Sequence, residues 1–160
     1  MKIAVLALVL VIFAFAKASK TPCRNELAAI EAYLAVLAAQ NNGVPPVGYD
    51  TPECSPDGTY APLQCKGASC HCKSADGIQI SEWFDIGMSD AASCICGRDS
   101  HEFMMTQMMG QMFECNETGG YKPVQCTGSV CFCVDHNGQR TGPGSINIAH
   151  ADQLGCDQFY

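Results

Sequence analysis

The chain has 160 residues, a formal net charge of −7 and twelve cysteines. The acidic balance argues against nucleic acid or an anionic membrane as a partner, because both are polyanions. It permits basic partners, calcium or mineral surfaces, but no run of like charge exceeds two residues, a pattern typical of a solvated surface.

Residues 1–18 have the pattern of a secretory signal peptide. Lys2 precedes an apolar run from Ile3 to Ala16, and Ala16-Lys17-Ala18 is a small-x-small cleavage pattern. The run is short for a membrane span, which disfavours an anchor. We therefore expect a secreted, extracellular monomer that begins near Ser19.

Thr21 and Pro22 predict the start of a helix over residues 23–40. Its apolar side chains recur at helical spacing, which predicts a stripe packed on a core: Leu27, Ile30, Leu34 and Leu37. The adjacent prolines in residues 44–53 predict an extended loop after this helix.

A cysteine cassette follows, and it occurs twice, over residues 54–72 and 115–133. In both copies ten residues separate the first two cysteines, four separate the next two, and Cys-x-Cys ends the cassette. Four further positions match residue for residue: Gly58, Tyr60, Pro62 and Gln64 with Gly119, Tyr121, Pro123 and Gln125. This is an internal repeat, so each copy predicts the same structural unit.

In the first copy, residues 60–65 and 71–74 predict two short strands, and residues 78–80 predict a third strand that pairs back through a hairpin. Residues 81–93 predict a looser segment.

In the second copy, Asp99 and Glu102 have capping-box spacing and predict a helix over residues 103–112. Its five methionines favour core filling over a recognition face. Residues 130–135 predict a strand, residues 139–141 its return, and residues from 142 to Cys156 a loop.

Twelve cysteines in a secreted chain indicate a disulfide scaffold rather than a thiol or zinc protein. Six cysteines per copy allow fifteen connectivities, and spacing alone does not choose among them. Cys70 and Cys72 alternate on a strand and face the same way, so they do not bond to each other, whereas Cys65 and Cys70 can close the loop between them.

That leaves Cys72 for Cys94 and Cys23 for Cys54. The same order in the second copy predicts Cys96–Cys115, Cys126–Cys131 and Cys133–Cys156. We expect no metal site at Cys70-His71-Cys72, because zinc needs two ligand pairs in a reducing compartment.

The second cassette, Gly119-Gly120-Tyr121-Lys122-Pro123-Val124-Gln125-Cys126 with Cys131-Phe132-Cys133-Val134 and the turn Asn137-Gly138, resembles the thyroglobulin type-1 repeat. The resemblance implies a small disulfide-rich α+β fold with two tandem domains, residues 19–95 and 96–160. Each would be a short helix plus a small antiparallel β-sheet held by three disulfides, and the family's sequential pairing agrees with the pairs above.

The chain departs from the family at three places. The family has Trp between the paired cysteines, where His71 and Phe132 stand here. Both four-residue cysteine loops are shorter than is common in the family. The segment between the first two cysteines has 18 residues in the second copy and 30 in the first.

Chains built of such repeats resemble thyropins, secreted inhibitors of papain-like cysteine proteases such as cathepsins. The resemblance implies loops that fill the protease cleft, at Val47, Gly48 and Tyr49; at Lys66, Gly67, Ala68 and Ser69; and at Thr127, Gly128, Ser129 and Val130. The alternative is a non-inhibitory extracellular matrix or interaction module that contacts calcium or mineral, although no Asp-x-Asp-x-Asp-Gly loop is present.

Catalysis and cofactors are not expected. A catalytic role needs a free nucleophile beside a base, and the cysteines are committed to bridges. The histidines have no adjacent Ser or Asp in a known arrangement: His71, His101, His136 and His150. Asn116-Glu117-Thr118 is an N-glycosylation sequon, predicted on an exposed turn.

Overall fold

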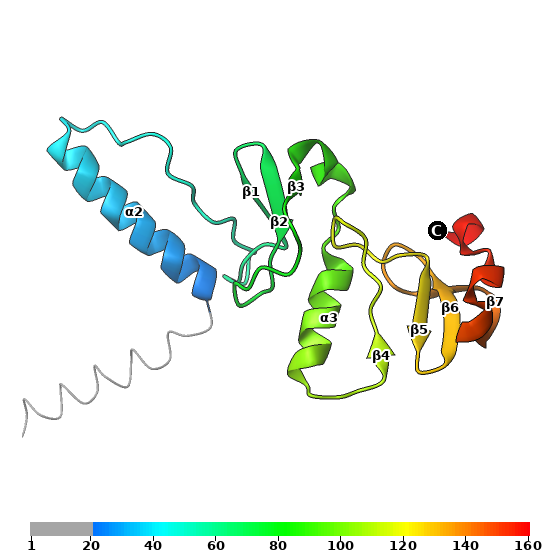
Figure 1. Ribbon diagram of the computed structural model, residues 1–160. Coiled ribbons are helices and arrows are strands. Elements are labelled where there is room, and N and C mark those ends of the chain that lie inside the picture. Colours follow the sequence, from blue (N-terminus) through cyan, green and yellow to red (C-terminus); the bar gives the residue numbers. More distant parts are fainter. Residues whose placement is uncertain (1–20) are drawn as a thin grey trace, which may run out of the picture. The chain divides into compact units, whose positions relative to one another are not determined.

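A computed structural model describes residues 21–160, so the signal peptide expected over residues 1–18 lies outside the described part (Figure 1). The chain divides into two compact units, one ending at Tyr60 and the other comprising Ala61–Tyr160. The domain boundary at residues 95/96 stays a prediction. Within residues 21–160, no helix is long and apolar enough to cross a membrane.

The first unit is built on helix α2, Pro22–Gln40, which confirms the predicted helix. Thr21 is its N-cap residue but makes no side-chain capping bond, and Pro22 occupies the first turn. The apolar stripe was predicted to be core, which is wrong: its side chains are only half-buried, and Cys23 is the one buried residue of the helix. On the loop that follows the helix, the Tyr49 ring lies edge-on to Tyr33 at 6.0 Å between centroids.

The second unit begins with a three-stranded antiparallel sheet in the order β1 (Leu63–Lys66), β2 (Ser69–Cys72) and β3 (Phe84–Asp85). The hairpin of the first two strands is as predicted, but the third strand is not residues 78–80. That segment does pair back through the predicted hairpin: Lys73 and Gln79 form a bridge, Ser74 N–H donates to the Ile78 carbonyl and Ile80 N–H to the Cys72 carbonyl, but the pairing is too short to form a strand of the sheet. Phe84, a few residues further along the chain, is buried opposite Cys70. We attribute the choice of residues 84–85 as the third strand to this burial.

Helix α3, Ile95–Met105, starts directly after Cys94, whose φ of 57° is left-handed. The prediction of a helix over 103–112 capped by Asp99 is therefore wrong. Asp99 lies inside the helix, and its carboxylate is an acceptor for the Tyr121 hydroxyl. The packing of Cys96 and Gly97 in the core extends the helix toward its N-terminus, an effect that local capping signals do not contain.

The second sheet has the order β4 (Gln111–Met112), β5 (Val124–Thr127), β6 (Val130–Val134) and β7 (Arg140–Asn147), all antiparallel. Strand β6 confirms the predicted strand. The return strand β7 is longer than residues 139–141, because a register shift at Phe132/Cys133 lets pairing continue to Asn147. Two 3-10 helices, η2 (Ile148–Leu154) and η3 (Cys156–Phe159), complete the chain.

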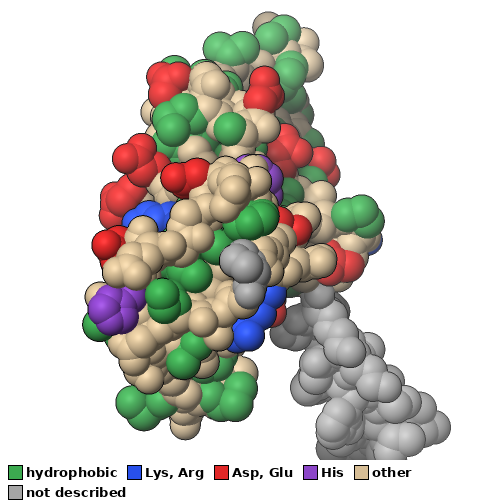
Figure 2. Space-filling model, turned by 90° about the vertical axis from the view of Figure 1, so that its right-hand side faces the viewer, with side chains coloured by type: hydrophobic (Ala, Val, Ile, Leu, Met, Phe, Trp, Pro, Cys, Tyr) green, Lys and Arg blue, Asp and Glu red, His purple; other side chains and the backbone are tan. Residues whose placement is uncertain are grey.

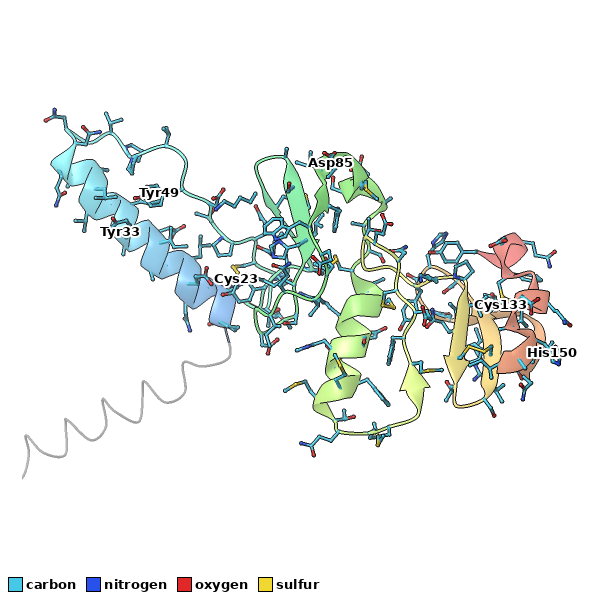
Figure 3. All side chains as sticks on the ribbon, in the orientation of Figure 1. Cys23, Tyr33, Tyr49, Asp85, Cys133 and His150 are labelled. Atoms are coloured by element: carbon cyan, nitrogen blue, oxygen red, sulfur yellow. A yellow bond between two sulfur atoms is a disulfide. The ribbon has the colours of Figure 1, made fainter. Side chains whose placement is uncertain are left out.

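Six disulfides link all twelve cysteines in the same pairs that the sequence predicts (Figure 3): Cys23–Cys54, Cys65–Cys70, Cys72–Cys94, Cys96–Cys115, Cys126–Cys131 and Cys133–Cys156. At least one cysteine of every bridge is buried, and few large apolar side chains are buried with them. Such a core is marginal alone, so the bridges supply much of the stability.

Inside residues 61–160 the first sheet packs directly on the second cassette. Cys72 Sγ lies 3.4 Å from the Thr118 carbonyl oxygen, and a Cβ added at Gly119 would lie 2.6 Å from that sulfur. Arg98 Nε donates to the Lys73 carbonyl at 2.9 Å. These contacts join the first sheet to the elements that follow it in one packed body.

Candidate functional site

The cassettes are frames made of buried polar groups. Gln125 is buried, and its amide nitrogen donates to the carbonyl oxygens of Glu114 (2.7 Å) and Lys122 (3.0 Å), while its oxygen accepts from the Glu114 N–H. In the first cassette Gln64 donates to the Ala61 carbonyl. The repeated glutamine thus fixes the backbone that enters each hairpin.

The repeated tyrosines are matched by a carboxylate three residues after the first cysteine of each copy. Tyr60 donates to Glu26, and Tyr121 donates to Asp99 at 2.6 Å. The bond to Glu26 raises the pKa of Tyr60 to about 12. Burial, followed by the bond to Asp99, raises the pKa of Tyr121 above its ordinary value. Both hydroxyls therefore stay protonated and act as structural donors.

The first candidate loop, residues 66–69, is a two-residue hairpin turn. Lys66 pairs with Ser69, so Gly67 and Ala68 are the central residues, and Gly67 has φ +58°. A positive φ at the first central residue matches a type II′ turn, which glycine adopts without strain. Lys66, Gly67 and Ala68 are exposed.

A disulfide and a backbone hydrogen bond hold this turn in place. The bridge Cys65–Cys70 joins directly opposed residues with 4.0 Å between their Cα atoms. The Ala68 carbonyl accepts a hydrogen bond from the Ile86 N–H at 2.9 Å. We call this arrangement, residues 65–70, the first stapled turn.

The second stapled turn, residues 126–131, repeats the arrangement. Thr127 pairs with Val130, Gly128 has φ +57°, and the Cys126–Cys131 bridge again spans 4.0 Å between Cα atoms. All four candidate residues from Thr127 to Val130 are exposed. The Ser129 carbonyl accepts from the Ile148 N–H, and Gly128 N–H donates to the Gly110 carbonyl, both at 2.9 Å.

The third candidate segment, Val47 to Tyr49, lies in the first unit, whereas both stapled turns lie in the second. Val47 is 95% exposed. The neighbouring Tyr49 contacts Tyr33 on α2, and a side-chain hydrogen bond with Tyr33 raises the pKa of Tyr49. The tip valine is therefore presented by a loop anchored on the helix.

Residues 109–111 were missed by the sequence reasoning. Gly110 bonds to Gly128 of the second stapled turn, and Gln111 pairs with Thr127. Met109 is 95% exposed, as Val47 is in the first copy. The signal was positional: an apolar residue followed by glycine stands shortly before the second cysteine in both copies.

Asn116 of the sequon is half-buried and Thr118 is buried, so only Glu117 of the predicted exposed turn is exposed. The Asn116 Oδ1 accepts from the N–H groups of Thr118 (3.1 Å) and Gly120 (2.8 Å) and from the Thr118 hydroxyl (3.1 Å). All three bonds use the oxygen, so they are compatible with a glycan on Nδ2. Occupancy of the sequon stays a prediction.

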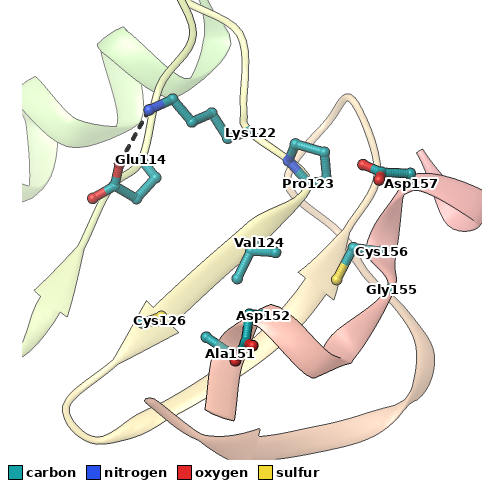
Figure 4. A pocket seen from close by; sticks show the side chains of 10 residues that line it. All are labelled: Glu114, Lys122, Pro123, Val124, Cys126, Ala151, Asp152, Gly155, Cys156 and Asp157. Carbon is teal, nitrogen blue, oxygen red and sulfur yellow. Dashed lines mark hydrogen bonds and ion pairs between the residues drawn. The ribbon is translucent and has the colours of Figure 1, made fainter. Parts of the chain in front are cut away.

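A pocket of about 470 Å³ lies between β5 and the C-terminal 3-10 helices (Figure 4). Its charged lining consists of Glu114, Asp152, Asp157 and Lys122, and Lys122 Nζ lies 3.4 Å from Glu114 Oε2. None of the buried unpaired polar atoms found in residues 21–160 lines it. The pocket therefore points to no particular ligand.

No group of His, Cys, Asp or Glu within the described residues could hold a metal ion. On the face in Figure 2, acidic side chains are interspersed with apolar and neutral ones rather than gathered in one patch. The candidate functional features are therefore the exposed loop tips described above.

Comparison with known proteins matches this architecture. The model of the thyroglobulin type-1 repeat fits residues 23–89 and 103–148. Pig (Sus scrofa) thyroglobulin is 28% identical over 121 residues, 68% of this chain but 4% of thyroglobulin. Equistatin from Actinia equina is 31% identical, with 59% of this chain and 44% of equistatin aligned.

U20-hexatoxin-Hi1a from Hadronyche infensa is 34% identical, with 52% of this chain and 59% of the toxin aligned. The chain thus spans less than two thirds of the length of each of these relatives. Two cassettes, six bridges and the fit of one family model to both copies lead to one conclusion: the chain belongs to the thyroglobulin type-1 repeat family.

Proposed function

We propose that the chain is a secreted inhibitor of papain-like cysteine proteases that places pinned loop tips in the active-site cleft. The observation that carries the proposal is the pair of stapled turns, in which exposed small residues stand on a disulfide between opposed strand residues. Similarity to thyropins gives the target class.

Pinned turns suit this task physically. Binding costs free energy wherever a loop must be ordered, and a turn already fixed by a bridge and backbone hydrogen bonds avoids most of that cost. Gly67 and Gly128 have no side chain, so a cleft wall can approach the backbone closely. Neither turn offers an easily cut extended peptide, because both are closed hairpins.

We assign the candidate loops to two inhibitory edges, as the resemblance to thyropins implies. The first copy contributes two separate loops, Val47 to Tyr49 and Lys66 to Ser69, which we call the first edge. The second comprises Thr127 to Val130, to which we add Met109 to Gln111, because Gly110 and Gln111 are bonded to the turn and Met109 precedes them directly. The proposal includes a cleaved signal peptide over residues 1–18, domains at 19–95 and 96–160, a monomeric extracellular form, no enzymatic activity and a glycan on Asn116.

The test is titration of the full secreted chain against papain and a cathepsin with a peptide substrate. We expect tight inhibition, weakened at least about tenfold when Ala68→Arg and Ser129→Arg are combined, because bulky charge at both turn tips blocks close approach. Gln153→Arg, also exposed but on η2, is the matched control and keeps full inhibition.

Absence of inhibition at micromolar chain would overturn the proposal. In that case retention of the chain on extracellular matrix, with or without calcium, would favour the interaction-module reading instead.

A further inference from the structure

Five methionines crowd into residues 104–112, which we call the methionine loop: Met104, Met105, Met108, Met109 and Met112. The sequence predicts that they fill the core, and the structure contradicts this. Met109 is 95% exposed, and the other four are 46–68% exposed. Apolar thioethers left in water are not explained by packing.

The loop is closed at its base and uncharged. The rings of Phe103 and Phe113, which flank it, lie 5.6 Å apart, and no residue between them carries a charge. It connects the end of α3 to β4, which returns beside β5 (Figure 1). The methionines are thereby held in one small exposed region.

This region touches the second stapled turn. Gly110 accepts from the Gly128 N–H, and Met112 pairs with Cys126. A chemical change in the methionine loop is therefore transmitted to the turn through backbone hydrogen bonds as well as through its own exposed surface.

We propose that the methionine loop is an oxidation site for peroxides, at which Met109 reacts first and sulfoxide formation disables the second edge. The thioether sulfur attacks one peroxide oxygen, the O–O bond breaks, sulfur gains that oxygen, and the other oxygen leaves as water. Sulfur is oxidised by two electrons and peroxide is reduced by two. The effect on the edge rests on the proposed inhibitory function, whereas the site of oxidation does not.

The physical consequence follows from polarity. A methionine is a flexible apolar group that suits an adaptable binding surface, and its sulfoxide is polar and strongly hydrated. Transfer of a sulfoxide from water to a protease surface costs free energy that the thioether does not cost. Methionine sulfoxide reductases reverse the change.

The chain contains its own comparison. The first edge, Val47 to Tyr49 with Lys66 to Ser69, has no methionine. Outside the loop, Met88 is the one other methionine in residues 21–160, at 39% exposure on the 3-10 helix η1 (Ile86–Ala91). Oxidation should therefore act on one edge and leave the other intact.

The first measurement maps sulfoxides by peptide mass spectrometry after limited hydrogen peroxide treatment of the full chain. Because reactivity follows exposure, we expect Met109 to oxidise about twofold faster than Met88. The Gly128 amide should also exchange hydrogen faster after oxidation. Oxidation of Met88 at the same rate as Met109 would overturn the modification site, and an unchanged Gly128 amide would overturn its coupling to the second stapled turn.

The second measurement isolates the second edge by Val47→Arg with Ala68→Arg in the full chain. Peroxide should weaken inhibition of papain about tenfold in this background. A form that also carries Met108→Leu and Met109→Leu should keep its inhibition after the same treatment, since leucine conserves volume and cannot be oxidised. Sulfoxide reductase should restore the inhibition of the form that keeps Met108 and Met109.

Equal losses in the two forms would overturn the role of the methionines at the edge. If the untreated natural chain does not inhibit at all, the proposed function fails, and the peptide map still decides the modification site by itself.

Discussion

The Tyr121 hydroxyl donates a 2.6 Å hydrogen bond to Oδ2 of Asp99, and this single bond ties the centre of the second cassette to helix α3. Tyr60 and Glu26 make the equivalent bond in the first copy. Two copies that differ in carboxylate and in helix length have kept the same donor and the same offset from the first cysteine. The pair is therefore a structural device of the fold rather than a feature of one copy.

Tyr121→Phe should destabilise the chain by about 1–2 kcal/mol, because a buried hydroxyl is lost and the carboxylate loses its partner. Tyr160→Phe is the control, since Tyr160 is exposed and its hydroxyl donates to the Tyr121 carbonyl rather than to a carboxylate. Denaturant unfolding monitored by circular dichroism measures both. Equal midpoints for the two variants would contradict a special role for Tyr121.

Stability should fall at high pH. The pKa values of Tyr60 and Tyr121 are raised in the folded chain, to about 12 for Tyr60, so the folded state holds protons that the unfolded state releases from about pH 10 upward. The contribution is complete below pH 10 and is lost as pH rises toward the folded values. Spectrophotometric titration should show a late tyrosine step that becomes smaller in Tyr60→Phe, where Tyr121 still titrates late. Titration of all five tyrosines together near pH 10 would contradict this.

His71→Phe should stabilise the chain. His71 is buried, its ring lies 4.2 Å from that of Trp83, and its Nδ1 has no hydrogen-bond partner among residues 21–160. Burial, followed by the charge of Lys73, lowers its pKa, so protonation is disfavoured in the folded state. The second copy already places Phe132 at the matching position.

For the natural chain, the contribution of His71 to stability is complete above pH 6.5 and falls as pH drops through the lowered pKa. His71→Phe should remove this slope and raise the melting temperature most at pH 5. Thermal unfolding at pH 5 and 7.5 measures both effects. A lower melting temperature of the variant at both pH values would refute the argument.

The two kinds of bridge in the second copy should differ in cost. Cys126–Cys131 closes a separation of 5 residues and Cys133–Cys156 one of 23. Replacing both cysteines by alanine should cost about 2 kcal/mol for the short bridge and about 3.5 kcal/mol for the long one. Inhibition measured at a temperature where both variants are folded should be reduced more by loss of the short bridge, because it holds the turn.

Gly138→Ala should destabilise strongly, by about 3 kcal/mol or more, since backbone strain at φ +77° is added to a core clash. An added Cβ would lie 2.5 Å from the Tyr121 ring. Gly43 is the matched control, with φ +84° and no atom within 4 Å of its added Cβ, and its alanine variant should lose only about 1 kcal/mol. Similar losses at both sites would exclude the clash.

The sequence predicts those parts of the fold whose signals are local or repeated. The geometry of Cys70 and Cys72 on one strand, together with the repeat of the cassette, predicts the bridges that the structure contains, and the periodicity of residues 23–40 predicts α2. Residues 84–85 and the extension of β7 depend on partners distant in the chain, and no local pattern marks them. The start of α3 at Ile95 depends in the same way on the burial of Cys96 and Gly97.

The methionine loop shows most clearly what local sequence patterns do not predict. Helical spacing of Met104, Met108 and Met112 favours one apolar face, but the chain leaves the helix after Met105 and Met112 enters a strand. Whether an apolar helix face is buried or exposed depends on which element packs against it, and that is set by the tertiary fold. The candidate edges were predicted from the resemblance to the family, except Met109 to Gln111. Their place beside the second stapled turn becomes visible only from the pairing of β4 with β5.

The packing of Gly119 against the Cys72–Cys94 bridge has a consequence for exchanging parts between relatives. The bridge belongs to the first copy and the glycine to the second, so the segment that is duplicated in sequence is not the block that packs in space. A chimera joined at residue 95 would set a foreign bridge against Gly119 and lose a matched surface. A chimera joined after Tyr60 would carry residues 61–160 as one interchangeable unit, with that surface intact.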